Sequence, residues 1–144
     1  MKGGIVLDIQ KLIEETVSPS PARGSACGAW APSPEYATTF EKIGEYYEIT
    51  TPYLDNANDY IQIYVKQDGD ELYITDDSAT IKGLKMSGFQ FTADRKAHLQ
   101  RILNQYGIKM DGDELIAKTP VKGFAQKKHM FIQAIMCIGQ LPHS

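Results

Sequence analysis

Hydrophobic and polar positions alternate most regularly between residues 59 and 76, where the chain reads DYIQIYVKQDGDELYITD. A period of two residues is typical of a β-strand with one buried face. Asp68 and Gly69 separate the two apolar runs, and an Asp-Gly pair between such runs is a strong signal for a two-residue hairpin turn. The pattern therefore predicts an antiparallel strand pair at the centre of the fold.

A turn at Asp68-Gly69 fixes which residues of the two strands face each other, since side chains alternate between the faces of a sheet. We expect helices to cover the face that carries Ile61, Ile63 and Val65. The predicted cross-strand pairs are Val65 with Leu72, Ile63 with Ile74 and Tyr64 with Tyr73.

Two further segments carry strand patterns. Residues 40–50 predict one strand that ends at Thr51-Pro52, because proline donates no hydrogen bond to a strand ladder. Residues 107–119 predict a second hairpin with a four-residue Asp-Gly-Asp-Glu loop. On the first strand the predicted shared face carries Ile43, Tyr47 and Ile49; in the second hairpin Met110 faces Leu115 and Ile108 faces Ala117.

Apolar residues with helical spacing predict helices over residues 8–17, 78–88, 93–106 and 124–139. Asp77 is the expected N-cap of the second helix, and Gly88 its C-terminal stop. The third begins after Thr92 and ends at Gly107, and the buried stripes of the last two are expected to be Leu99, Ile102, Leu103 and Tyr106, and Phe124, Phe131, Ile135 and Ile138. Strands in runs rather than alternating with helices indicate a single α+β domain, an antiparallel sheet with helices packed on one face.

Residues 18–36 differ from the rest, because Pro, Ser, Ala and Gly dominate them. Such a composition is typical of a flexible loop without regular structure. The loop contains Trp30, the only tryptophan of the chain. We expect this large aromatic side chain to attach the loop to the body of the domain, with contact to a partner as the alternative.

The composition, 42% hydrophobic and 23% charged, is that of a soluble globular domain. No apolar run approaches the roughly 18 residues of a membrane span. Asp8 and Lys11 interrupt any signal-peptide core. Cys27 and Cys137 match no metal-ligand spacing, so reduced thiols in the cytoplasm are the default expectation, with a disulfide between them as the alternative.

Charge is unevenly distributed along the chain. Residues 44–94 carry 3 basic and 10 acidic side chains, a net charge of −7, whereas residues 95–144 carry 8 basic and 3 acidic side chains, a net charge of +5. The basic candidates for nucleic-acid contact are Arg95, Lys96, Arg101, Lys127 and Lys128. The overall acidity argues against direct nucleic-acid binding, and an exposed helix face is the commoner explanation for these lysines.

Asp55, Asp59, Asp76 and Asp77 are the candidates for catalytic chemistry. In the predicted register Asp59 and Asp76 approach the same end of the sheet, where carboxylates could hold Mg²⁺ for a metal-dependent nuclease. The alternative is structural: Asp55 and Asp59 stabilise turns and Asp77 caps a helix. We favour the structural alternative, and expect no metal, no cofactor and no catalytic residues.

Tyrosines gather on the face opposite the predicted core. Tyr60, Tyr64 and Tyr73 share this face in the predicted register, and Asp55, Asp59 and Asp76 surround it. An open face with tyrosines and an acidic rim has the composition of a protein-binding surface. We therefore expect these six residues to contact a partner protein; the alternative is that a helix or the loop with Trp30 covers this face.

Several strings also occur in a known family in the same order: ITTPYLD, NDYIQIYV, ITDD, MSG, GDEL and QKKH. Over about residues 40–139 the chain resembles an uncharacterised family of bacteria and their phages, domain of unknown function 1828. The resemblance implies a protein of a mobile element, and we expect it to bind a host protein, such as a nucleic-acid-binding defence protein that it inhibits in the manner of an anti-CRISPR. Family members usually have glycine after ITDD, where this chain has Ser78, which argues against an obligatory positive φ there.

Overall fold

The computed structural model describes residues 39–55 and 58–143 of the 144-residue chain. The predicted helix over 8–17, the segment 18–36 with Trp30, and Cys27 lie outside the described residues.

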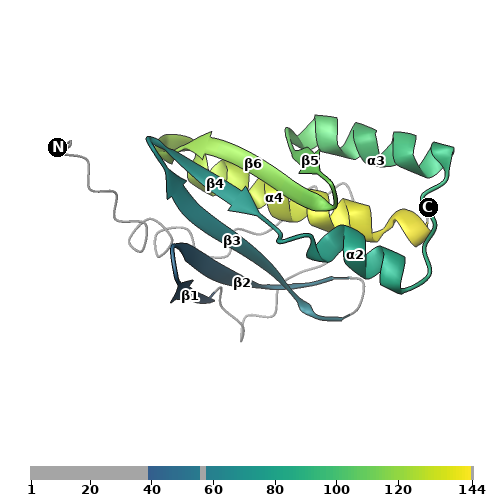
Figure 1. Cartoon of the computed structure of the whole chain (residues 1–144), viewed down its shortest axis with the longest axis horizontal. Helices are drawn as coiled ribbons and strands as arrows, with labels where there is room; N and C mark the ends of the chain where they lie inside the picture. The colour runs from purple at the N-terminus through teal and green to yellow at the C-terminus, as the bar shows by residue number, and fades with distance from the viewer. Residues whose placement is uncertain (1–38, 56–57, 144) are drawn as a thin grey trace.

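The described residues form six strands and three α-helices (Figure 1). The strands make one antiparallel sheet in the order β1-β2-β3-β4-β6-β5. The predicted α+β class is therefore confirmed. The strands are β1 (Thr39–Ile43), β2 (Tyr46–Leu54), β3 (Tyr60–Asp68), β4 (Glu71–Thr75), β5 (Lys109–Asp111) and β6 (Glu114–Pro120), and the helices are α2 (Ala79–Met86), α3 (Ala93–Tyr106) and α4 (Phe124–Gly139), with short 3-10 turns at Val121–Gly123 and Leu141–His143.

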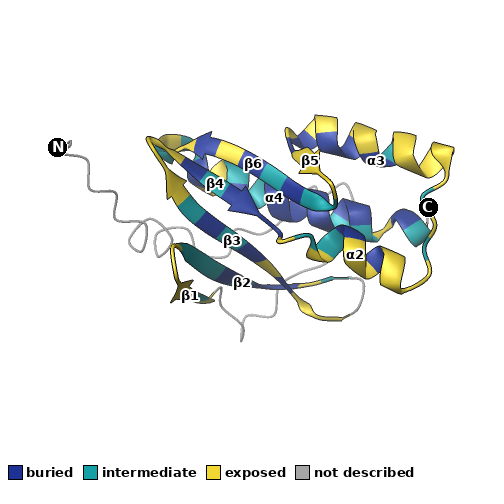
Figure 2. Ribbon diagram, in the orientation of Figure 1, coloured by how far each residue is buried: buried dark blue, intermediate teal, exposed yellow. Residues whose placement is uncertain are grey.

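The core lies between the sheet and the helices. Figure 1 shows α4 running behind β4 and β6, with α2 and α3 beside it. Ile61, Ile63 and Val65 are buried on the side of β3 that belongs to this core, so the predicted helix-covered face is confirmed. Figure 2 shows the resulting alternation of buried and less buried positions along β3 and β6. None of the helices in the described part of the chain is long and apolar enough to cross a membrane.

The central hairpin turns one residue later than the sequence suggested. Asp68 pairs with Glu71, so the two loop residues are Gly69 and Asp70. Gly69 has φ +64°, and glycine at the first central position is the preference of a type II′ turn, whereas our prediction placed glycine second as in type I′. The predicted pairs are therefore wrong: Val65 faces Ile74 and Lys66 faces Tyr73. The two-residue slip keeps every side chain on its predicted face.

Within residues 39–55 and 58–143, two other hairpins have the same turn. Gly44 precedes Glu45 between β1 and β2, and Gly112 precedes Asp113 between β5 and β6, each glycine with a φ close to that of Gly69. The segment predicted as one strand over 40–50 is thus a hairpin. The second predicted hairpin has the right register, with Met110 opposite Leu115, but its loop has two residues rather than four.

Pro52 does not end β2, contrary to our prediction. The pairing of β2 with β3 shifts between Thr50 and Leu54, which places Pro52 in a bulge where a missing N–H is tolerated. The Thr51 hydroxyl donates a hydrogen bond to the Ile61 carbonyl at 2.9 Å and accepts one from the Tyr53 N–H. This side chain thereby supplies the contact that the interrupted ladder lacks.

Helix α3 follows its sequence signals closely. The Thr92 hydroxyl accepts a hydrogen bond from the Arg95 N–H, Gly107 ends the helix with φ +66°, and the four predicted stripe residues are buried. Lys127, which we assigned to an exposed basic face, donates from Nζ to the carbonyl oxygens of Tyr106 and Gly107. Its charge therefore sits at the negative end of the α3 dipole.

Helix α4 also has its predicted bounds and stripe. Lys128, however, is only 7% exposed, so our placement of this residue on the polar side is wrong. It fills the gap in the stripe between Phe124 and Phe131. Cys137 is buried on the same helix and is disulfide-bonded, so the expected reduced thiol is wrong for this residue.

Helix α2 begins after a strained turn. Asp77 and Ser78 have φ of +56° and +68°, although only glycine adopts such angles without steric cost. The inference that Ser78 argued against a positive φ is therefore wrong. Glycine would adopt the Ser78 backbone without that steric cost.

Replacing Ser78 with glycine is expected to raise the free energy of unfolding by about 1 kcal/mol. A left-handed backbone costs a non-glycine residue roughly 1–2 kcal/mol, from which the extra backbone entropy of glycine is subtracted. Urea denaturation followed by circular dichroism measures the change. Ser87→Gly is the matched control: Ser87 has φ −85° and its hydroxyl bonds the Leu84 carbonyl, so glycine there should destabilise. Destabilisation by Ser78→Gly would contradict the strained turn.

Candidate protein-binding surface

The side of the sheet that faces away from the helices is lined by alternate residues of the central strands. Cross-strand pairing brings Glu48 opposite Tyr64, Lys66 opposite Tyr73, and Tyr73 opposite Lys118. The described helices pack on the other side (Figure 1). We call this surface, centred on Tyr46, Tyr64, Lys66 and Tyr73, the open face.

Lys66 lies at the centre of the open face between two aromatic rings. Its Nζ is 5.2 Å from the ring centroid of Tyr46 and 5.3 Å from that of Tyr73, within the range of cation–π attraction. A hydrogen bond with Tyr46 is the main cause that raises the pKa of Lys66. The ammonium, which is charged at physiological pH even at its ordinary pKa, lies within reach of both rings.

Two carboxylates accept hydrogen bonds from tyrosine hydroxyls of the open face. The Tyr64 hydroxyl donates to Glu48 Oε2 at 3.2 Å, and the Tyr73 hydroxyl donates to Glu114 Oε2 at 3.3 Å. Glu114 Oε2 also accepts a hydrogen bond from Thr75 at 2.5 Å. These bonds fix the rings in a layer across β2, β3, β4 and β6.

The environment raises the pKa of both phenols. Burial, followed by the charge of Glu114, raises the pKa of Tyr73 to about 12. Burial and the neighbouring Glu48 raise the pKa of Tyr64 as well. A tyrosine hydroxyl is protonated at physiological pH even without such a shift, so both hydroxyls are hydrogen-bond donors, and the open face presents aromatic rings beside these carboxylates.

The predicted tyrosine trio does not form one cluster. Tyr60 lies four residues from Tyr64 on β3, about 13 Å away at the usual rise of a strand. It pairs with Leu54, and the two side chains are 39% and 49% exposed. The structure brings Tyr64 and Tyr73 together with Tyr46 and Lys66, two residues that the sequence analysis did not predict as contacts. A prediction with the correct register of β3 on β4, together with the pairing of β2 with β3, would have placed Tyr46 and Lys66 in this cluster.

Asp55 and Asp59 close the loop between β2 and β3. The Asp55 Oδ1 accepts a hydrogen bond from the Asp59 N–H at 3.0 Å, and the Asp55 N–H donates to the Asp59 carbonyl at 2.8 Å. This is the turn-stabilising arrangement that the sequence favoured. Both residues lie at the Tyr60 end of the sheet, away from Lys66.

Asp76 caps the start of helix α2, a role that the sequence analysis predicted for Asp77. Its carboxylate caps α2, accepting from the N–H groups of Ser78 at 2.9 Å and Thr80 at 3.0 Å. It also accepts from the Leu115 N–H at 3.0 Å, which ties the helix to β6. Asp76 is 1% exposed, so we leave it out of the candidate surface.

The carboxylates considered for Mg²⁺ do not converge. Thr75 faces Tyr64, which places Asp76 level with Ile63, four residues or about 13 Å along β3 from Asp59. In the described ranges, 39–55 and 58–143, no group of three or more His, Cys, Asp or Glu side chains could hold a metal ion. The arrangement gives Asp59 and Asp76 separate structural tasks.

The basic residues considered for nucleic-acid contact are also used within the fold. Arg95 donates to the Gln90 carbonyl at 2.8 Å and stacks its guanidinium 4.4 Å from the Phe89 ring. Lys127 caps α3 and Lys128 is buried. The set therefore does not form one exposed basic stripe.

The fold and the surface define a small α+β domain with helices on one face of its sheet and an ordered aromatic layer on the other. The chain belongs to the family described as domain of unknown function DUF1828, which it matches over residues 51–138, more than half of its length. The predicted family resemblance is thus confirmed over this range. No curated protein and no solved structure matches the chain.

Proposed function

We propose that the domain is a non-catalytic protein-binding module and that its open face is the contact surface. The observation that carries the proposal is the ordered layer of Tyr46, Lys66 and Tyr73 on the side of the sheet opposite the helices. Tyrosine is enriched at interfaces because it supplies a large contact area with few rotatable bonds. Here the rings are already held in place, which lowers the entropic cost of binding.

The charge of the segment that carries this surface favours a basic partner. Residues 44–94, which contain β2, β3 and β4, carry a net charge of −7. On the open face itself Glu48 and Glu114 lie beside the rings, together with the cations Lys66 and Lys118. Complementary charge speeds and orients association. The partner that fits this surface has a positively charged patch, as nucleic-acid-binding proteins do.

The partner we propose is a host defence protein, which the domain would inhibit stoichiometrically as an anti-CRISPR does. The support for this finer proposal is the sequence resemblance to proteins of bacteria and their phages. An acidic, aromatic surface placed on a nucleic-acid groove would block that groove without any chemical step.

Replacing two tyrosines of the open face with alanine should strongly weaken the binding of the partner. The tagged full chain is incubated with proteins from the cell that naturally makes it, and the captured protein is identified and purified. Binding of this protein to Tyr46→Ala/Tyr73→Ala is expected to weaken by at least roughly thirtyfold, as for interface hot spots. The interaction should also weaken as salt is raised, because salt screens surface charge.

The matched control changes two exposed side chains of α3, Lys96→Ala and Arg101→Ala, which should leave the affinity unchanged. Circular dichroism and thermal unfolding establish that both double variants are folded. Equal binding by the folded Tyr46→Ala/Tyr73→Ala protein would show that the open face is not the contact surface. Recovery of nucleic acid alone would contradict protein binding altogether.

A further inference from the structure

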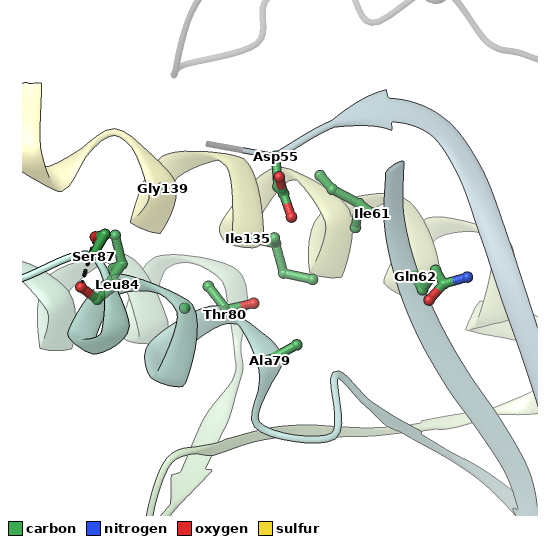
Figure 3. A pocket seen from close by; sticks show the side chains of 10 residues that line it. Asp55, Ile61, Gln62, Ala79, Thr80, Leu84, Ser87, Ile135 and Gly139 are labelled. Carbon is green, nitrogen blue, oxygen red and sulfur yellow. Dashed lines mark hydrogen bonds between the residues drawn. The ribbon is translucent and has the colours of Figure 1, made fainter. Parts of the chain in front are cut away.

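A pocket of about 210 Å³ opens at the end of the sheet between β3, α2 and α4, separate from the open face. Figure 3 shows Ile61, Leu84 and Ile135 around it, each from a different one of these elements. All three are buried, so they form the floor of the pocket. The lining residues are Asp55, Ile61, Gln62, Ala79, Thr80, Gly83, Leu84, Ser87, Ile135 and Gly139.

Most of the lining is apolar. A buried water usually makes about three hydrogen bonds, so water is poorly held against such a surface. An apolar group that displaces poorly held water gains affinity. Six of the ten lining residues have no polar atom in their side chain, namely Ile61, Ala79, Gly83, Leu84, Ile135 and Gly139.

Three of the polar side chains in the lining already have partners within the fold. The Ser87 hydroxyl donates to a carbonyl of α2 at 2.8 Å, and the Gln62 amide donates to the Thr50 hydroxyl at 3.0 Å. The Asp55 carboxylate accepts a hydrogen bond from the Asp59 N–H at 3.0 Å. Among the described residues that line the pocket, none is basic. The lining therefore presents no positive charge to an anion, and its one carboxylate is already engaged, so the site favours an uncharged ligand.

Gly83 keeps the α2 side of the pocket open. A Cβ built at this position meets nothing within 4 Å, and the backbone is helical. Alanine would therefore fit, and it would stabilise the interior of the helix by roughly 1 kcal/mol relative to glycine. An apolar cavity of about 150 Å³ holds one benzene molecule, so a pocket of about 210 Å³ has room for a ring with a small substituent.

We infer that this pocket binds a small uncharged apolar molecule of the size of one substituted aromatic ring. The ring packs on Ile61, Leu84 and Ile135 and lies beside Gly83. A charged group on the ring would lose hydration that the lining does not replace. The volume is below the roughly 300–1,000 Å³ of pockets for drug-sized ligands, so a single ring fits better than a larger cofactor. The site does not depend on the open face or on its proposed partner.

Titration of the full chain with toluene tests the inference. Methyl resonances of Ile61, Leu84 and Ile135, followed by NMR, are expected to shift and to saturate. Benzylamine and benzoate carry a positive and a negative charge on the same ring. Each should bind at least roughly tenfold more weakly than toluene, because a charged group loses free energy when it leaves water. Absence of saturable toluene binding, or equal affinity for toluene and either charged compound, would overturn the inference.

Two substitutions on α2 locate the ligand. Ala79→Leu and Gly83→Leu lie one turn apart on the face of the helix that lines the pocket. Each places an apolar side chain in the space of the ring and should weaken toluene binding at least roughly tenfold, as the loss of 1.4 kcal/mol or more does. The control is Lys82→Leu, the same new side chain on α2 outside the lining, which should leave the affinity unchanged. Circular dichroism establishes which variants are folded. Undiminished toluene binding to either folded pocket variant would show that the ligand lies elsewhere.

Discussion

Replacing Asp76 with alanine is expected to lower the free energy of unfolding by about 3–5 kcal/mol, the largest single effect we predict. The substitution leaves three backbone N–H groups, those of Ser78, Thr80 and Leu115, without their acceptor in or beside the core. Each buried donor left unsatisfied costs roughly 1–3 kcal/mol. The change also releases α2 from β6, because the carboxylate joins both elements.

Urea denaturation followed by circular dichroism measures this effect. Asp76→Asn retains one acceptor oxygen, but its amide NH₂ group replaces the other oxygen and points at an N–H donor. The free energy of unfolding of this variant should therefore lie between those of Asp76→Ala and the natural protein. Asp77→Asn is the control, since Asp77 is exposed and asparagine tolerates its left-handed backbone; it should change the free energy by less than about 0.5 kcal/mol. A loss below about 1 kcal/mol for Asp76→Ala would contradict the capping role.

Replacing Lys128 with methionine is expected to stabilise the protein by about 2 kcal/mol at pH 7. Burial lowers the pKa of Lys128 from 10.5 to about 8, because the charged form loses its hydration. A shift of this size corresponds to roughly 3 kcal/mol of differential stability. Methionine fills a similar volume without a charge, and the loss of the lysine's own contacts offsets part of the gain.

The effect has a defined pH dependence. Between about pH 8 and 10.5 the unfolded chain binds the Lys128 proton and the folded protein does not, so the natural protein gains stability as pH rises through this window. The advantage of Lys128→Met should therefore be full below pH 8 and disappear by about pH 10.5. Chemical denaturation at pH 7, 9 and 10.5 measures it, with exposed Lys122→Met as the control. A Lys128→Met protein that is less stable than the natural one at pH 7 would refute the cost of the buried charge.

Helices α3 and α4 were predictable because local signals fix them. Thr92, Gly107 and the apolar stripes depend on the backbone geometry of one element and need no knowledge of its neighbours. Lys128 was misplaced for the complementary reason. Whether a lysine at an apolar stripe position is buried depends on the tertiary packing around it and not on helical period alone.

The hairpin register was less predictable from the residues. Gly69 fits either central position of a two-residue turn, and both positions keep Ile63, Val65 and Ile74 on the same face. The hydrophobic pattern therefore could not choose between them. The centre of the candidate surface depends on that choice, since only the observed register places Lys66 opposite Tyr73.

The ends of strands were the hardest to predict. The sequence shows two adjacent aspartates after β4, but which one caps α2 is decided by the reach of Asp76 to the Leu115 N–H, 39 residues away. The sequence predicts a strand end at Pro52 because the bulge that tolerates this proline forms only when β2 pairs with β3. The supporting hydrogen bond of the Thr51 hydroxyl is likewise made to Ile61 of β3.

Hydroxyl-radical footprinting of the captured complex tests the central claim most directly. Tyr46, Tyr64 and Tyr73 are partly exposed in the domain alone, and their oxidation is read residue by residue by mass spectrometry. The open-face account predicts that all three are protected when the partner is bound, while Phe89 and Phe91, beside α3, oxidise as before. Protection of Phe89 and Phe91 with unchanged oxidation of the three tyrosines would contradict it.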